Sequence, residues 1–148
     1  MWVRGRASAI RDKGGEAIAV RADITLDEDI ERLMQAAIDE WGRLDILINN
    51  AGGSPLQAPL IDLPREEWDA TVALNLTAVW NCTRVAVRHM TDGGRIVNVS
   101  SIAAQKIVPT SGHYSTAKRG VNSLTESFAL ELAPRIRVNA VMPGLVPT

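Results

Sequence analysis

The stretch RIVNVSSIAAQKIVPTSGHYSTAK, residues 95–118, joins an apolar run, a loop and the beginning of a helix. The apolar run over residues 95–99 is typical of a buried parallel strand. Tyr114 and Lys118 are one helical turn apart, so their side chains lie on the same helix face. A cation held that close favours the phenolate, which can exchange a proton with an alcohol or ketone. Ser101, after the strand, could hydrogen-bond the same substrate oxygen. The three residues therefore indicate carbonyl and alcohol redox chemistry, with the hydride held by a cofactor.

Apolar strands and amphipathic helices alternate along the rest of the chain. Strands are predicted over residues 16–22, 44–48, 95–99 and 136–141, and helices over residues 4–13, 26–41, 65–90 and 113–132. This alternation predicts parallel βαβ units within one α/β domain spanning residues 1–148. Thr25 is a candidate cap of the second helix, because Glu28 follows three residues later. Gly93 and Gly94 are expected to end the third helix.

Length and composition narrow the possible functions. A chain of 148 residues is long enough for one small domain and too short for two. Its net charge of -1 gives no electrostatic reason to expect a nucleic acid or an anionic membrane as partner. The only cysteine, Cys82, is expected to be a buried thiol in a reducing compartment.

The sequence gives no support for a metal site, a membrane span or a secreted location. No cluster of His, Cys and carboxylate residues has the spacing of a metal site. No apolar run approaches the roughly 18 residues that span a bilayer. The N-terminal residues lack the apolar core of a signal peptide, so a cytoplasmic location is the expectation.

Several polar or small residues follow predicted strands, at the edge where ligands bind in open α/β sheets. Asn49-Asn-Ala-Gly52 would let a flat ring approach the backbone, although Asn and Gly are equally typical of an ordinary turn. Asp23 could accept a hydrogen bond from an adenine amino group, or it could simply cap the next helix. Residues 143–148 (PGLVPT) offer backbone groups and the Thr148 hydroxyl to a carboxamide, or they form a plain turn.

Two residues within predicted helices have alternative interpretations. Asn75 interrupts a long apolar helix, where Asn is a poor helix former. It either faces solvent or marks a kinked turn that holds a water near Lys118. His113 precedes Tyr114 and could line a substrate pocket. A lone histidine is more often a packing or surface residue, so His113 is left outside the predicted catalytic set.

Taken together and in order, these motifs resemble the short-chain dehydrogenase/reductase family over nearly the whole chain. The matching stretches are Asp23-Ile24, Asn49-Asn-Ala-Gly52, Asn75, Ile96-Val-Asn-Val-Ser-Ser101, Tyr114-x-x-x-Lys118 and Pro143-Gly144-x-Val146-x-Thr148. The resemblance implies a Rossmann-like, doubly wound parallel sheet and NAD or NADP as cofactor. It also implies hydride transfer between the nicotinamide and a carbonyl or secondary alcohol carbon, chemistry that the cofactor supplies.

The resemblance further implies a role for each matching residue. Tyr114 would be the general acid and base, and Lys118 would assist it and bond the nicotinamide ribose. Ser101 would orient the substrate oxygen, and Asn75 would position a relay water. The remaining positions would contact the cofactor: Asp23 and Ile24 at the adenine, Asn50, Ala51 and Gly52 along the cleft, and Pro143, Gly144, Val146 and Thr148 in the nicotinamide segment, where Val146 and Thr148 hold the carboxamide.

The chain differs from the family's pattern at both ends. It has no Gly-x-x-x-Gly-x-Gly, so the sheet is expected to be truncated, without its first two strands, their glycine-rich turn and its last strand. That turn would hold the pyrophosphate, and the second strand would discriminate NAD from NADP. The strand at residues 16–22 would lose both neighbours, and must pair elsewhere, stay loose or expose an apolar edge. We therefore expect the isolated chain to bind cofactor poorly and to be marginally stable.

Two functions remain open for a chain of this kind. The first is an oxidoreductase acting on a small-molecule alcohol or ketone. The second is a non-catalytic remnant that serves as an oligomerisation module. The family builds homodimers and homotetramers through the helices that match residues 65–90 and 113–132. The loops at residues 53–64 and 102–112 mix apolar and polar side chains, so they do not identify a substrate.

Overall fold

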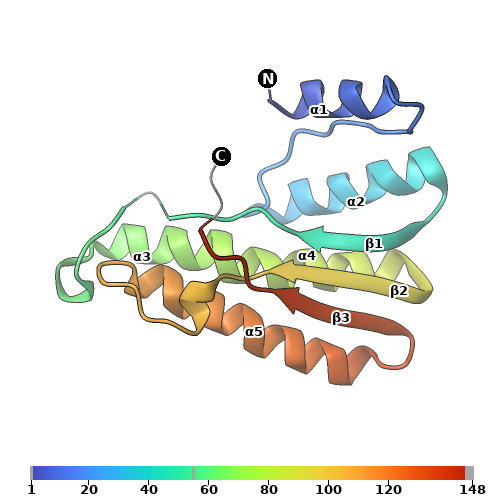
Figure 1. The fold of residues 1–148 in the computed structure, drawn as a ribbon. Helices are drawn as coiled ribbons and strands as arrows, with labels where there is room; N and C mark the ends of the chain where they lie inside the picture. Colours follow the sequence, from blue (N-terminus) through green and yellow to red (C-terminus); the bar gives the residue numbers. More distant parts are fainter. Residues whose placement is uncertain (1, 55, 146–148) are drawn as a thin grey trace.

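A computed structural model describes residues 2–54 and 56–145 of the chain (Figure 1). Its helices are α1 (Trp2–Arg11), α2 (Asp27–Trp41), α3 (Arg65–Val72), α4 (Ala78–His89) and α5 (Gly112–Leu132). Its strands are β1 (Leu44–Asn49), β2 (Met90–Val99) and β3 (Ile136–Val141). A π-helical turn at Ala73–Thr77 joins α3 to α4, and single 3-10 turns lie at Leu60–Asp62 and Ile102–Ala104.

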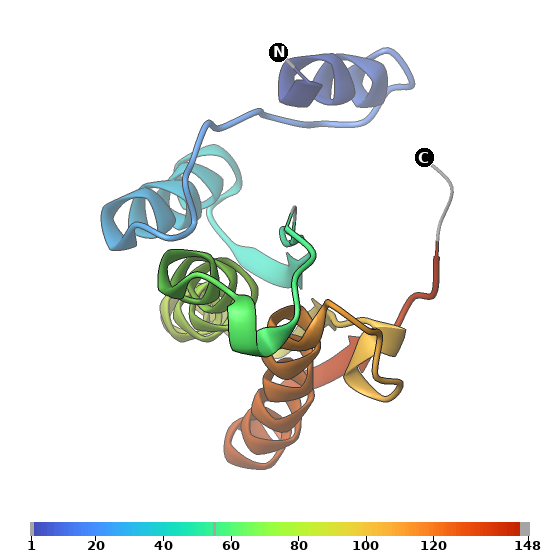
Figure 2. The same cartoon turned by 90° about the vertical axis from the view of Figure 1, so that its left-hand side faces the viewer.

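The three strands form one parallel sheet in the order β1-β2-β3. Parallel neighbours need a crossover connection, and here α3–α4 links β1 to β2 while α5 links β2 to β3. Helices α2, α4 and α5 cover one face of the sheet, as the view onto the carboxyl ends of the strands shows (Figure 2). The architecture therefore matches part of a Rossmann-like, doubly wound sheet.

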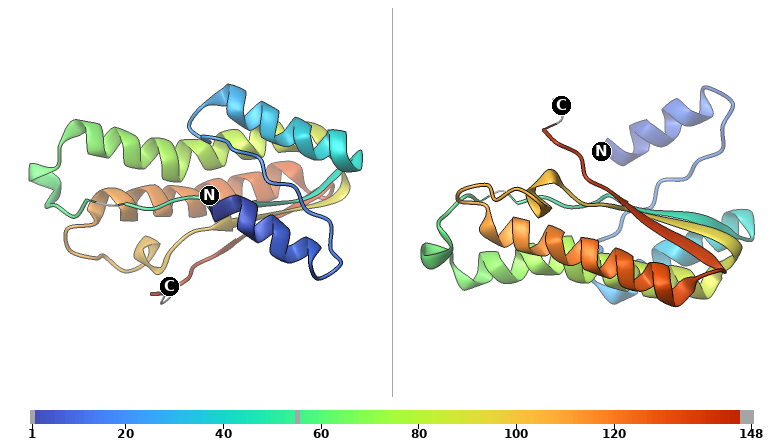
Figure 3. Two further views of the ribbon diagram at one scale, coloured as in Figure 1. Left: turned by 90° about the horizontal axis from the view of Figure 1, so that it is seen from above. Right: turned by 60° about the horizontal axis from the view of Figure 1, so that its bottom comes forward.

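Alternation along β1 separates a covered face of the sheet from an open one. Leu47 packs toward the helices, whereas Ile46 and Ile48 are 52% and 61% exposed. Ile96 on β2 and Val138 on β3 are buried. Two views of the ribbon show the strands layered on the long helices along their whole length (Figure 3).

The covered face holds two apolar clusters. One lies between α2 and α4 and contains Ile30, Met34, Cys82, Val85 and Ala86. The other lies between the sheet and α5 and contains Met90, Ile96, Ile136 and Val138. The predicted burial of the Cys82 thiol is confirmed, and burial raises its pKa to about 11.

Four buried polar side chains cross the core beside these clusters. Asn49 Nδ2 donates to Thr83 Oγ1 at 3.2 Å and to Asn98 Oδ1 at 2.9 Å. Asn98 Nδ2 then donates to Thr125 Oγ1 at 2.9 Å. Because buried polar groups must find partners, this chain of bonds fixes the register of β1 and β2 against α4 and α5.

The predicted strand at residues 16–22 is wrong. These residues are extended, but they pair with no strand in the part of the chain that the structure describes. Two of its backbone carbonyls accept hydrogen bonds from arginine side chains instead. Arg11 Nη1 donates to Ala17 O at 2.8 Å, and Arg32 Nη1 donates to Arg21 O at 2.9 Å. The physical reason is that a strand needs a neighbour to complete its hydrogen bonds, and this segment has none.

The predicted Thr25 cap is also wrong, because α2 begins at Asp27 with Leu26 as its N-cap. Thr25 instead donates to Asp23 Oδ1 from its backbone N at 2.9 Å and from Oγ1 at 2.7 Å. The Asp23 backbone N donates to Asp29 Oδ2 at 2.7 Å. A local turn around the Asp23 carboxylate therefore outcompetes the capping box.

The long helix predicted over residues 65–90 is present within one residue of those bounds, but it is divided. Its middle turn is π-helical, and α4 ends at His89. Gly93 and Gly94, expected to break the helix, lie inside β2, which begins at Met90. The remaining strands and α5 lie within one residue of their predicted bounds.

Candidate active site

The predicted motifs meet at the carboxyl edge of the sheet. The turn at residues 50–54 follows β1, Ser100 and Ser101 follow β2, and residues 142–145 follow β3. Backbone bonds from Ser100 N to Val141 O (2.8 Å) and from Ile102 N to Pro143 O (3.0 Å) join the last two segments. Pro143 and Gly144 therefore lie beside the Ser101 segment, while Val146 and Thr148 lie outside the described residues.

Hydrogen bonds hold both the side chain and the backbone of Lys118. Its Nζ donates to Val99 O at 2.8 Å, and its own carbonyl accepts from Ser100 Oγ at 3.1 Å. The residue is only 3% exposed, and this burial lowers the pKa of the Lys118 amine. Nζ lies 5.7 Å from the centre of the Tyr114 ring, as the one-turn spacing predicts.

Asn75 lies in the π-helical turn and is fully buried, so a solvent-facing asparagine is excluded. Its Oδ1 accepts from Gly53 N at 2.9 Å, and its Nδ2 donates to Gly53 O at 2.8 Å and to Thr71 O at 2.9 Å. The amide thus holds the turn after β1 by both backbone groups of one residue. π-Helical turns occur often at functional sites.

Gly52 connects Asn75 to Lys118. A Cβ on Gly52 would lie 2.7 Å from Asn75 Oδ1 and 3.2 Å from Lys118 Nζ. A side chain at this position would therefore force the Asn75 amide to shift. The structure therefore brings Gly52, Asn75, Lys118 and Tyr114 into one cluster.

Ser101 caps the 3-10 turn after β2. Its Oγ accepts a hydrogen bond from Ala103 N at 3.1 Å, and the residue is half-buried. A hydroxyl that accepts from a backbone N–H still has its own proton to donate. Ser101 can therefore donate to an oxygen that approaches the edge of the sheet.

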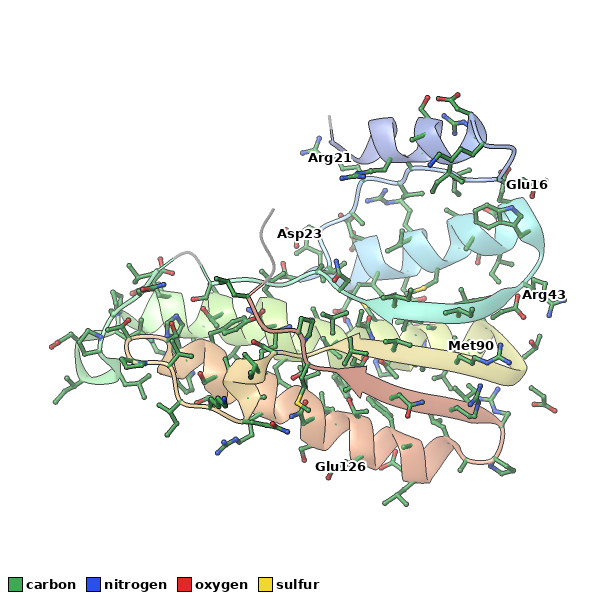
Figure 4. All side chains as sticks on the ribbon, in the orientation of Figure 1. Glu16, Arg21, Asp23, Arg43, Met90 and Glu126 are labelled. Carbon is green, nitrogen blue, oxygen red and sulfur yellow. The ribbon has the colours of Figure 1, made fainter. Side chains whose placement is uncertain are left out.

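A separate cleft of about 820 Å³ lies between the extended segment before α2 and the turn after β1. Asp23 and Ile24 line it from one side and Ala51 from the other, together with Arg21, Asp29 and Arg32. Arg21 and Asp23 lie on the segment that leads into α2 (Figure 4). Hydrogen bonds from Thr25 lower the pKa of the Asp23 carboxyl, which keeps it ionised. The exposed Asn50 lies on the same turn as Ala51.

Ser54, Ser100 and His113 also hold this edge together, and of these the sequence analysis considered only His113, as a pocket, packing or surface residue. His113 is fully buried, and its Nε2 lies 2.7 Å from Ser54 Oγ. The signal that could have predicted the burial of His113 is a spacing of four along α5. His113, Ala117, Val121 and Thr125 repeat at that interval and are all buried.

Within residues 2–54 and 56–145, no group of three or more His, Cys, Asp and Glu side chains could hold a metal ion. No helix in the same ranges is long and apolar enough to cross a membrane.

The fold and the site together define an α/β protein with its candidate site at the carboxyl ends of parallel strands, the edge where open α/β sheets bind ligands. A family model described as "Enoyl-(Acyl carrier protein) reductase" matches residues 3–148. Solved structures similar to this chain include several described as short-chain dehydrogenases or reductases. The chain belongs to the short-chain dehydrogenase/reductase family.

Individual relatives are similar over almost all of this chain. It is 43% identical over 145 residues to the cis-4-hydroxycyclohexanecarboxylate dehydrogenase of Sinomonas cyclohexanicum, covering 96% of this chain and 58% of that protein. It is 40% identical over 138 residues to a 3-oxoacyl-[acyl-carrier-protein] reductase of Synechocystis, covering 91% and 56%. The carveol dehydrogenase of Mycobacterium avium in complex with NAD superposes with a TM-score of 0.93 at 34% identity, covering 98% and 54%. The chain thus spans a little over half the length of these relatives.

Proposed function

We propose that this chain contributes the catalytic part of an NAD(P)-dependent oxidoreductase that interconverts a carbonyl and a secondary alcohol. One observation carries the proposal: Lys118 Nζ lies 5.7 Å from the Tyr114 ring centre and next to Gly52, which also contacts Asn75. A buried amine beside the chain's only phenol, at the ligand-binding edge of a parallel sheet, is suited to proton exchange with a substrate oxygen.

The residues present fit the adenosine half of a dinucleotide. The cleft beside Asp23 and Ala51 has a volume of about 820 Å³, and ionised Asp23 can accept from an amino group on its remaining lone pairs. Two similar structures, a carveol dehydrogenase and a xylitol dehydrogenase, are described as containing NAD or NAD+. We propose NAD or NADP as cofactor, which when bound supplies the carbon centre that gives or takes the hydride.

The chain's own residues would then manage the substrate oxygen and its proton. Tyr114 donates a proton to a carbonyl oxygen, or accepts one from an alcohol. The Lys118 cation beside the ring stabilises the phenolate that results. Ser101 donates its free hydroxyl proton to the same oxygen and so orients the substrate.

The proposal also gives roles to the Lys118 amine and to Asn75. Because burial lowers the Lys118 pKa, this amine releases a proton more readily than an exposed lysine does. The relay water that Asn75 would position is part of the proposal. So are cofactor contacts from Ile24, Asn50, Gly52, Pro143, Gly144, Val146 and Thr148.

A second candidate, an oligomerisation module, is favoured by one surface feature. A groove of about 400 Å³ runs between α4 and α5, with Leu76, Trp80 and Leu124 along it. Trp80 is 44% exposed there, a large apolar side chain at the surface. We propose that residues 65–90 and 113–132 form a homodimer or homotetramer interface.

We also propose that the protein works in the cytoplasm.

The deciding experiment measures binding and assembly on the same purified chain. NADH and NADPH are titrated by nucleotide fluorescence, and oligomeric state is measured by light scattering. Binding in a defined dimer or tetramer supports the enzyme, and a screen of alcohols and ketones with Tyr114→Phe as control follows. Because the isolated chain is expected to bind cofactor poorly, weak binding is compatible with the enzyme, and only a defined oligomer that binds neither nucleotide at the highest concentrations tested supports the oligomerisation module. Trp80→Ala serves as the interface control, since it should dissociate the oligomer.

A further inference from the structure

His113 is a fully buried side chain with one satisfied and one unsatisfied nitrogen. Its Nε2 lies 2.7 Å from Ser54 Oγ, while Nδ1 is buried without a hydrogen-bond partner among the described residues. Buried polar atoms without partners are rare and call for an explanation. The proposed mechanism gives His113 no role, although it directly precedes Tyr114 in α5.

The contacts of Ser54 decide which nitrogen of His113 carries the proton. Ser54 Oγ also donates to Leu56 O at 3.2 Å, and a hydroxyl has only one proton to give. With the Ser54 proton given to the Leu56 carbonyl, His113 Nε2–H is the donor to Ser54 Oγ. A neutral ring in this arrangement has a bare acceptor at Nδ1, so the unsatisfied atom is a lone pair rather than an N–H group.

Among the described residues, the Ser54 contact and two others tie the loop after β1 to the segment that begins α5. Ala58 N donates to Thr110 O at 2.9 Å. The Leu60 side chain packs so closely on Gly112 that a Cβ there would lie 2.7 Å from it. Of the three, only the bond from His113 lies next to the turn that forms the proposed site.

That turn is held from its other side by the π-helical turn. Asn75 binds both backbone groups of Gly53, the residue before Ser54. We propose that His113 is a positioning residue that, through Ser54, fixes the turn at residues 52–54 against the helical turn that carries Tyr114. This inference rests on the proposed function, in which that turn and Tyr114 serve one reaction.

The first test reads the tautomer directly. The chain has two histidines, so a His89→Gln variant leaves His113 as the only imidazole in long-range 15N–1H spectra. We expect the Nε2–H tautomer, and we expect Ser54→Ala to lose it. A ring protonated on Nδ1, or one that averages between both tautomers, overturns the inference.

The second test reads the effect on Tyr114. It is the only tyrosine, so ring-labelled tyrosine gives signals from this residue alone. Ser54→Ala and His113→Gln should shift the same Tyr114 signals in the same direction, and Ser54→Thr, which keeps the hydroxyl, should restore them. Unchanged Tyr114 signals in both variants would mean that the bond supports only the loop, and would overturn the inference.

Amide exchange distinguishes a local effect on the turn from a general loss of stability. Ser54→Ala should accelerate exchange of the Gly53 amide by roughly three- to tenfold, the worth of one hydrogen bond. Ile96, at the centre of β2, should exchange at the wild-type rate. Equal acceleration at Ile96 would show global destabilisation and contradict a positioning role. None of these measurements needs cofactor or turnover, so a failure to bind NADH counts against the proposed function alone.

Discussion

Replacing Gly52 with alanine tests whether the turn after β1 is held rigidly. The added Cβ would lie 2.7 Å from Asn75 Oδ1, and ordinary Cβ contacts begin near 3.0 Å. The Asn75 amide must therefore move by at least ~0.3 Å, and overpacking of this kind costs about 1–3 kcal/mol. The amide cannot move freely, because it makes three hydrogen bonds of 2.8–2.9 Å with Gly53 and Thr71.

Gly120→Ala is the matched control for this variant. Its Cβ would also meet a side chain within 3.0 Å, but the neighbour is the flexible tip of Leu76 at 2.9 Å. Leu76 lines the groove between α4 and α5 and has room to turn. Replacing a glycine inside a helix also gains about 0.5–1 kcal/mol. We therefore expect Gly120→Ala to be neutral or slightly stabilising.

The assay is urea unfolding followed by far-UV circular dichroism, run on both variants and on Asn75→Ala. If the clash with Asn75 is the cause, Gly52→Ala should cost much less in the Asn75→Ala background than alone. Such non-additivity is the signature of two residues in contact. Equal losses from Gly52→Ala in both backgrounds, or equal losses from the two glycine variants, would refute the reasoning.

Three further changes have expected outcomes that follow from burial. Lys118→Met should abolish the proposed catalysis yet raise the free energy of unfolding by ~0.5–2 kcal/mol, since it removes a buried cation. Because burial lowers the Lys118 pKa below 10.5, wild-type stability should rise with pH toward 10.5, and the advantage of Lys118→Met should shrink over that range in pH-dependent urea titrations. Asn98→Ala should cost about 2–4 kcal/mol of unfolding free energy, because it strips partners from buried Asn49 and Thr125. Iodoacetamide should label Cys82 only after denaturation, as mass spectrometry can show, because the thiol is buried and its pKa is about 11.

Most of the fold could be predicted because each of its elements carries its own signal. Apolar periodicity predicts the strand at residues 136–141 and the helix at residues 113–132, and a proline marks the end of that helix. The bounds of β3 and α5 in the structure agree with these predictions within one residue. The strand at residues 16–22 failed for the opposite reason. Its sequence is compatible with a strand, but a strand also needs a neighbour, which lies beyond any local pattern.

The candidate site shows the same division between local and distant information. The one-turn spacing of Tyr114 and Lys118 predicts their proximity, and the structure places Nζ 5.7 Å from the ring centre. The hydrogen bonds between Asn75 and Gly53 could not be predicted, because 22 residues separate them in the sequence and the orientation of the amide depends on the π-helical turn. The burial of His113 was within reach, since its spacing of four with Ala117 marks the inner face of α5.

The two halves of the proposed cofactor site differ in how firmly they are held. Hydrogen bonds to Val99 and Ser100 hold Lys118, and hydrogen bonds to Gly53 and Thr71 hold Asn75. The Asp23 cleft instead rests on an extended segment whose carbonyls are held by exposed arginines. Exposed side-chain contacts of that kind contribute little stability, so this segment should open far more easily than the sheet. Amide exchange should therefore find residues 16–24 poorly protected and residues 95–99 well protected, and weak nucleotide binding would then reflect the adenine side of the site rather than a disordered catalytic cluster.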